Sequence, residues 1–217
     1  MFTRRLVLAL AVLAGPAFGQ TAPAPAPVPA ATPAPAEAPL PRVALTTSVG
    51  VIVVELDTKR APITAGNFLR YVDQKRLDGI MFYRVSKVQD HFGFVQFGVD
   101  GDPKRILPPI KLETTTMTGI KHLDGTLSNP RLAPGTGRGE FTIMVGDQPG
   151  MDADPSRPDD ATKTNLGYAA FGHVVEGMDV VMKIFDAPKS PTATVRGSFK
   201  GEVPVAPVKV LSARRVK

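Results

Sequence analysis

The sequence predicts a mainly β fold, a barrel built from short strands and capped by helices. Two observations carry this prediction. Many short runs have the alternation or the β-branched content of strands, and the connections between them are rich in turn residues. Two segments show helical spacing instead. Residues 42–217 are long enough for a single domain with a core of its own.

The domain opens with a hairpin signature. Val43, Leu45 and Thr47 alternate, residues 48–50 can turn, and the β-branched run 51–56 follows. The sequence therefore predicts two paired antiparallel strands at the start of the domain.

The remaining elements follow from the same signals. Pro62 stands where a helix can begin, and apolar residues at helical spacing extend it to about Lys75. A second helix is expected at 177–185. Residues 100–112 and 146–165 are rich in glycine, proline and aspartate and are expected to form surface loops. Further strands are expected at 81–86, 93–99, 125–128, 140–145, 168–174 and 208–214.

Residues 1–19 have the pattern of a cleaved export signal. Arg4 and Arg5 precede a short apolar run, and Ala17 and Gly19 stand at the positions that a signal peptidase reads. The run is too short for a bilayer, which needs roughly 20 apolar residues, although an uncleaved membrane anchor stays an alternative. We expect a periplasmic protein in a Gram-negative envelope, with the general and twin-arginine export routes both open.

A spacer separates this signal from the domain. Residues 20–41 are almost entirely alanine and proline, so the segment is expected to be extended and semi-rigid. The chain has no cysteine, which excludes a lipid-modified N-terminus, disulfides and thiolate metal sites.

Composition excludes further classes of function. The formal net charge of +6 falls to +4 without Arg4 and Arg5, and the basic residues are scattered, so no nucleic-acid partner is expected. No two of the three histidines lie at ligand spacing, and neither a phosphate-binding loop nor a nucleophile elbow is present. The glycines of 135–139 precede a strand, and the acidic loop 152–160 lacks the glycine and glutamate of a calcium loop. We expect no metal, no cofactor, no stable membrane span and a monomer.

The strands also carry polar residues where apolar ones would suffice. Arg84 lies inside the strand 81–86, and Gln96 shares a strand face with Phe94. Taken alone, Arg84 is most simply an outward-facing, solvated side chain.

Read together, the segments resemble the cyclophilin family in order and spacing over nearly all of residues 42–217. The resemblance implies a closed eight-stranded antiparallel β-barrel with two α-helices, a substrate groove on its outer wall, and peptidyl-prolyl cis/trans isomerase activity without a cofactor. The stretches that carry it are residues 45–56, 61–68, 79–85, 94–103, 125–128, 139–143 and 168–177.

The resemblance also implies site residues. Arg84 falls on the family's catalytic arginine, Gln96 on the glutamine that binds the substrate backbone, and Phe94 on a methionine of the proline pocket. The first pocket phenylalanine has its counterpart at Phe92 or is displaced. The other substrate-binding positions fall on Asn129, Glu140, Phe141, Thr142, Leu166 and Tyr168.

Several positions depart from the family. Glu140 stands where many members have glutamine, and Thr142 replaces a pocket phenylalanine, which should loosen the hold on a proline ring. Residues 128–131 replace an alanine/asparagine stretch that binds substrate backbone. The chain has no tryptophan, so cyclosporin should inhibit weakly.

The sequence thus predicts an isomerase of X-Pro bonds that acts on proline-containing polypeptides and assists the folding of exported proteins. The alternative is a chaperone or scaffold that binds proline peptides on the same barrel with little turnover. The enzymatic prediction requires that Arg84 face a surface depression and not be buried below the wall in an internal ion pair.

Overall fold

The structure, a computed structural model, describes residues 38–99, 101–161 and 163–216. The predicted signal and nearly all of the predicted spacer lie outside the described residues. No helix within the described ranges is long and apolar enough to cross a membrane.

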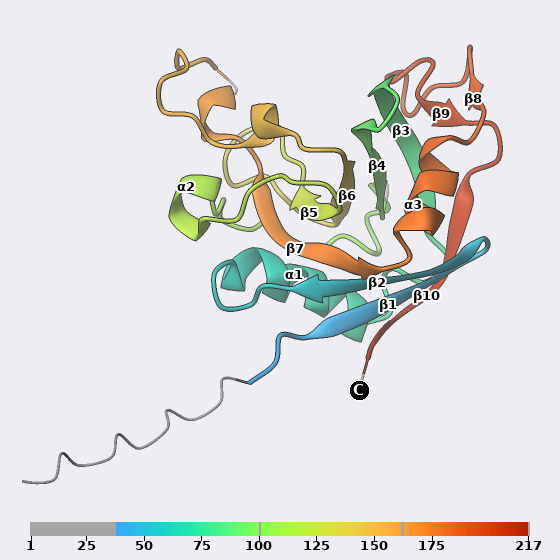
Figure 1. Cartoon of the computed structure of the whole chain (residues 1–217), viewed down its shortest axis with the longest axis horizontal. Coiled ribbons are helices and arrows are strands. Elements are labelled where there is room, and N and C mark those ends of the chain that lie inside the picture. The colour runs from blue at the N-terminus through green and yellow to red at the C-terminus, as the bar shows by residue number, and fades with distance from the viewer. Residues whose placement is uncertain (1–37, 100, 162, 217) are drawn as a thin grey trace, which may run out of the picture. The chain divides into compact units, whose positions relative to one another are not determined.

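Eight strands close into an antiparallel barrel, which confirms the predicted fold class (Figure 1). Their order around the barrel is β1-β10-β3-β4-β6-β5-β7-β2. A separate two-stranded sheet pairs β8 (Lys189–Ser190) with β9 (Val203–Pro204). The barrel strands are β1 (Arg42–Thr47), β2 (Gly50–Leu56), β3 (Met81–Gln89), β4 (Phe92–Gly98), β5 (Thr126–Asn129), β6 (Glu140–Val145), β7 (Ala169–Glu176) and β10 (Val208–Arg215).

The helices differ somewhat from expectation. α1 (Pro62–Asp73) and α3 (Met178–Phe185) are the two predicted helices. A third, α2 (Thr115–Thr118), was not predicted, because a single turn rich in threonine shows no helical periodicity. Two 3₁₀ turns, η1 (Pro149–Met151) and η2 (Thr164–Leu166), lie within the long loop after β6.

The start of α1 is capped by a distant carboxylate. Pro62 occupies the first turn, where its missing N–H costs no hydrogen bond. The backbone N–H groups of Ile63 and Thr64 donate to the carboxylate of Glu113 at 3.0 and 2.7 Å. Glu113 is buried, and its charge also suits the positive end of the helix dipole. This contact ties the loop before α2 to the helix.

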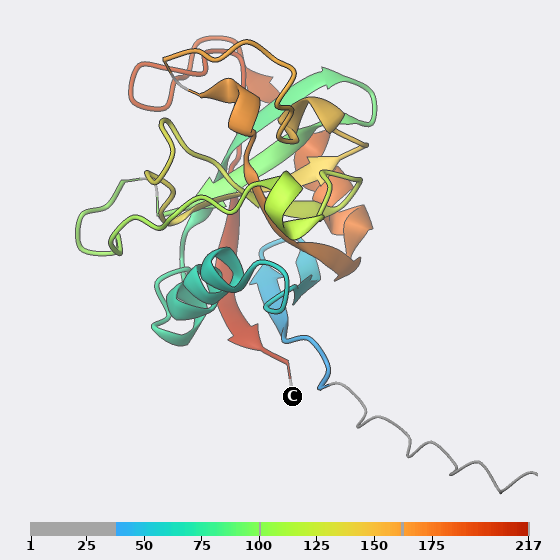
Figure 2. The same cartoon turned by 90° about the vertical axis from the view of Figure 1, so that its left-hand side faces the viewer.

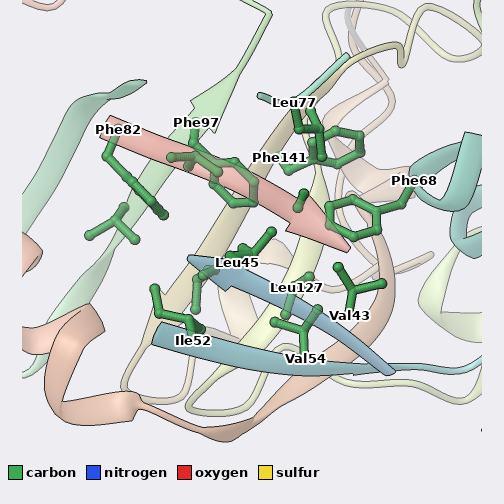
Figure 3. Close-up of a cluster of buried hydrophobic side chains, with 14 of the residues drawn as sticks. Val43, Leu45, Ile52, Val54, Phe68, Leu77, Phe82, Phe97, Leu127 and Phe141 are labelled. Atoms are coloured by element: carbon green, nitrogen blue, oxygen red, sulfur yellow. The ribbon is translucent and has the colours of Figure 1, made fainter. Parts of the chain in front are cut away.

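α1 and α3 pack against opposite ends of the barrel. Phe68 of α1 contacts Phe141 at the start of β6, with ring centroids 4.8 Å apart. A Cβ added at Gly93, at the start of the antiparallel neighbour β4, would lie 3.0 Å from the ring of Phe185 in α3. Apolar side chains from all eight strands fill the space between the helices, and Figure 3 shows the phenylalanines and branched residues at its centre.

The strands divide their side chains between this core and the outer wall. On β6, Phe141, Ile143 and Val145 point inward and are fully buried. Glu140 and Thr142 alternate with them and point outward. The outer face of β3, β4 and β6 is where a surface site can form.

Candidate active site

A groove of about 760 Å³ lies on the outer wall over β3, β4 and β6. Its floor is made of side chains that alternate with the core residues of the same strands, and its rim comes from the loops after β4 and β5 and from residues 195–199. The lining residues used below are Tyr83, Arg84, Phe94, Gln96, Gly101, Ser128, Glu140, Thr142, Met144, Tyr168, Arg196 and Phe199.

A β-bulge places two consecutive side chains of β3 in the groove. Phe82 pairs with Phe97, but the next pair joins Arg84 to Gln96, so Tyr83 is the extra residue. A bulge of this kind interrupts the alternation of side chains along a strand. Tyr83 and Arg84 therefore both line the groove, while Phe82 before them and Val85 after them are buried in the core.

These side chains form a continuous chain of hydrogen bonds. Arg84 Nη1 donates to Gln96 Oε1 at 3.1 Å, and Gln96 Nε2 donates to the Tyr83 hydroxyl at 2.7 Å. That hydroxyl donates in turn to Glu140 Oε2 at 2.6 Å. The bonds to Arg84 and Tyr83 use the oxygen and the nitrogen of the Gln96 amide, so both ends of that amide are fixed.

The guanidinium of Arg84 has further contacts. Its Nε donates to Glu202 Oε2 at 2.5 Å. Its central carbon lies 3.7 Å from the ring centroid of Phe199 and 5.0 Å from that of Phe94. The Arg84 side chain is 18% exposed and that of Glu202 is 32% exposed. Arg84 thus faces the groove, as the enzymatic prediction requires, and its ion pair lies at the groove wall and not in the barrel interior.

Most of the expected site residues lie together. Arg84, Phe94, Gln96, Glu140, Thr142 and Tyr168 all line the groove.

The expectation that Phe141 binds substrate is wrong. Its ring is fully buried and packs against Phe68, Phe97 and Phe171. It is a core residue, because its neighbours in β6, Glu140 and Thr142, both point to the groove side.

Three further positions also lie apart from the groove lining. Phe92 and Leu166 are half-buried outside it. Asn129 is buried, and its amide donates to the backbone carbonyls of Arg138 and Glu140 at 3.1 and 2.7 Å. Asn129 therefore fixes the approach to β6 and does not present its side chain to the groove.

The sequence did not indicate three residues that line the groove, Tyr83, Met144 and Phe199, or Glu202, which contacts Arg84 beside it. Tyr83 was missed because alternation places it on the opposite face from Arg84. Phe199 and Glu202 lie more than 100 positions from Arg84 in a segment without periodicity. Met144 could have been found, since it shares a face of β6 with Thr142.

A buried histidine supports the groove floor. Asp152 Oδ1 lies 2.8 Å from His122 Nδ1, and Ser128 Oγ lies 2.8 Å from His122 Nε2. A carboxylate can only accept, so Nδ1 donates and Nε2 accepts from the serine hydroxyl. Burial lowers the pKa of His122, although the carboxylate of Asp152 opposes the shift. The His122 side chain is fully buried. It holds Ser128 beside Thr142, its pair on β6, whose hydroxyl donates to the Ser128 carbonyl at 3.3 Å.

In the part of the chain that the structure describes, no group of three or more histidine, aspartate or glutamate side chains could hold a metal ion. The groove offers instead a fixed cation, a fixed amide and apolar surface from Phe94, Met144 and Phe199. This arrangement suits binding and polarisation of a neutral, partly apolar group.

Comparisons with known proteins agree with this geometry. A family model described as cyclophilin type peptidyl-prolyl cis-trans isomerase matches residues 42–215. A peptidyl-prolyl cis-trans isomerase of Acinetobacter baylyi is 31% identical over 173 residues, which cover 79% of this chain and 84% of the relative. Peptidyl-prolyl cis-trans isomerase A of Dickeya dadantii is 33% identical over 180 residues, covering 81% and 84%.

A solved structure has the same fold. The cyclophilin type isomerase of Cryptosporidium parvum, crystallised in the presence of the dipeptide Ala-Pro, superposes with a TM-score of 0.61 at 18% identity. The match covers 81% of this chain and 99% of that one.

Proposed function

Because the chain belongs to the cyclophilin-type peptidyl-prolyl cis-trans isomerase family and is an enzyme of that class, we propose that it accelerates rotation about X-Pro bonds in exported proteins, with Arg84 as the catalytic residue. The observation that carries the proposal is the hydrogen bond between Arg84 and Gln96 on the floor of an open groove.

The chemical task is to weaken amide resonance. Rotation about the peptide bond meets a barrier of about 18–20 kcal/mol, and an X-Pro bond exchanges spontaneously in roughly 10–100 s at room temperature. No covalent intermediate is needed. A cationic donor directed at the prolyl nitrogen localises its lone pair and gives the C–N bond more single-bond character.

Arg84 suits this task. A guanidinium stays charged at all physiological pH values and presents several donors in one plane. Nε and Nη1 are engaged with Glu202 and Gln96, whereas Nη2 has no hydrogen-bond partner among the described residues. That nitrogen is therefore the one we assign to the substrate. A contact that strengthens as the bond twists lowers the barrier, whereas uniform binding does not.

The other groove residues would hold the two sides of the bond. Phe94 and Met144 offer apolar surface to the proline ring, and the Gln96 amide can pair with substrate backbone. Thr142 supplies less apolar surface than an aromatic residue would, so the ring is expected to be held weakly.

The substrates that we propose are proline-containing segments of unfolded exported proteins. Support comes from residues 1–19, with the pattern of an export signal, and from the proline-rich residues 20–41. Fractionation of cells that express the full chain, beside a chain without residues 1–19, tests this location. The full chain should appear in the periplasm and the shortened one in the cytoplasm; a full chain retained in the cytoplasm contradicts the proposal.

The catalytic role is tested with the Arg84→Ala variant and a short proline peptide. A drop in kcat/KM of about 30-fold or more is expected, since a charged donor to the transition state contributes about 2 kcal/mol or more. Circular dichroism should show the barrel intact. Equal activity of the folded variant would remove Arg84 from the mechanism, and peptide binding by the wild-type chain without turnover would favour the chaperone or scaffold instead.

A further inference from the structure

Residues 195–202, which we call the strap, contribute Val195, Arg196, Ser198 and Phe199 to the groove lining. The strap precedes β9, and β9 lies beside β3 (Figure 1). In both views the region between β8 and β9 lies at the end of the barrel away from α1 (Figures 1 and 2).

Backbone contacts fix the strap in place. The backbone N–H of Val85 donates to the carbonyl of Glu202 at 2.7 Å, directly after Arg84 in β3. Near its other end, a Cβ added at Gly101 would lie 2.1 Å from Arg196 Nη2, so the guanidinium covers that glycine closely. The strap is thus hydrogen-bonded to β3 and lies close to the loop after β4.

Glu202 reaches Arg84 from this anchored backbone. Its carboxylate accepts from Arg84 Nε at 2.5 Å and from Ser86 Oγ at 3.5 Å. A charge-assisted hydrogen bond is roughly twice as strong as a neutral one. The carboxylate therefore restrains the arginine at Nε, while Gln96 restrains it at Nη1.

Phe199 covers the face of the same guanidinium. Its ring centroid lies 3.7 Å from the central carbon of Arg84. Its backbone has φ 61°, in the left-handed region that bulky residues rarely adopt. Backbone strain of this kind is concentrated at functional sites, where the surrounding structure compensates for it. The left-handed residue is thus the one whose ring covers Arg84.

We propose that Glu202 and Phe199 are positioning residues for Arg84. Together they fix the plane and the rotation of the guanidinium, so that Nη2 is presented to the prolyl nitrogen before substrate binds. This inference rests on the proposed catalytic role of Arg84. A preoriented group loses less freedom in the transition state, so Glu202, which does not line the groove, should act on turnover and not on binding.

Kinetics of three variants test the proposal. For Glu202→Ala we expect kcat to fall about ten-fold with KM changed less than about two-fold. Glu202→Gln keeps an acceptor oxygen, so its kcat should fall only about three-fold. Phe199→Ala should lose about three-fold in kcat, and Phe199→Tyr, which keeps the ring, should restore it.

Asp186→Asn is the matched control. Asp186 accepts from Lys87 Nζ of the same strand at 2.8 Å, so the variant also removes a carboxylate paired with a β3 cation, away from the groove. It should keep wild-type kcat. If Glu202→Ala does not fold, Glu202→Gln and Phe199→Ala still decide the question.

A second readout reports on the arginine directly. In a ¹H–¹⁵N spectrum of the full chain, the Nε–H signal of Arg84, assigned by its loss in Arg84→Lys, should be shifted by the carboxylate. Glu202→Gln should move that signal and Asp186→Asn should not.

The outcomes separate the two proposals. If Arg84→Ala loses activity while both Glu202 variants keep or exceed wild-type kcat, the strap does not position the arginine. The positioning inference then fails, and the proposed function stands. An unshifted Nε–H signal in Glu202→Gln also overturns the positioning inference. If Arg84→Ala keeps full activity, the proposed function itself fails.

Discussion

Tyr83 and Arg84 are consecutive residues of β3, yet both side chains line the groove, because Tyr83 is the extra residue of a bulge opposite Gln96. The bulge brings the Tyr83 hydroxyl between Gln96 and Glu140. One irregular position thereby links the amide that would bind substrate backbone to the carboxylate of Glu140.

Tyr83→Phe removes both hydrogen bonds of the hydroxyl, and the one that orients Gln96 has a net contribution of about 0.5–1.5 kcal/mol. The variant should therefore lower kcat/KM for a proline peptide about two- to ten-fold. The melting temperature should change little. Glu140→Gln keeps an acceptor for the Tyr83 hydroxyl, so it should lower kcat/KM less than Tyr83→Phe does. A Tyr83→Phe variant as active as the wild type would show that the hydroxyl does not orient Gln96.

Substitutions at Phe141 and Phe94 should have different effects, the first on stability and the second on peptide binding. Phe141→Leu should lower the free energy of unfolding by about 1–2 kcal/mol, because it leaves space among tightly packed rings. The variant should keep its KM. Phe94→Ala, in the groove, should raise KM and cost little stability. Urea denaturation and peptide kinetics measure both; a raised KM in Phe141→Leu would place that ring in the groove after all.

Thr142→Phe should tighten the hold on proline. Thr142 lies on the groove floor opposite Gln96, and an added aromatic surface of moderate size contributes about 1 kcal/mol to binding. KM for a proline peptide should fall about three- to ten-fold. Thr142→Val, which removes the hydroxyl and keeps the volume, should not reproduce the effect. Unchanged binding in Thr142→Phe would show that the threonine is not the weak point of the pocket.

His122 should make stability depend on pH. Burial lowers the pKa of His122 below its ordinary value of 6.5. Between 6.5 and the lower folded value, the unfolded chain binds a proton that the folded chain does not. The free energy of unfolding should therefore fall as pH drops below about 6.5 and level off once pH passes the folded pKa.

His122→Gln should flatten this dependence between pH 7 and pH 5, as followed by melting temperature. His173→Gln, which removes an exposed histidine of β7, is the matched control. Equal slopes in wild type and His122→Gln would assign the pH dependence to other groups.

The sequence predicted the strands well where alternation was regular. Residues 140–145 were expected as a strand and form β6 with the same bounds. The prediction for Phe141 was nevertheless wrong in a way that the sequence could have shown. If Glu140 and Thr142 face the groove, the residue between them faces the core.

Other features were beyond the reach of local pattern. The bulge at Tyr83 depends on how β3 pairs with β4, and pairing register is a property of two strands. The approach of Glu202 to Arg84 depends on the closed barrel and on the β8–β9 sheet, whose two-residue strands leave no periodic trace. The strand pattern singled out the arginine and the glutamine, and the resemblance supplied their roles. The contacts that hold them required the three-dimensional arrangement.

The barrel wall is a single strand thick. Val85 and Phe97 pack in the core, and Arg84 and Gln96 of the same two strands line the groove outside. Substitutions at outward-facing positions can therefore alter substrate preference without replacing the inward-facing residues that keep the molecule folded. Copies of such a gene could diverge widely in what they recognise while unfolding at nearly the same temperature.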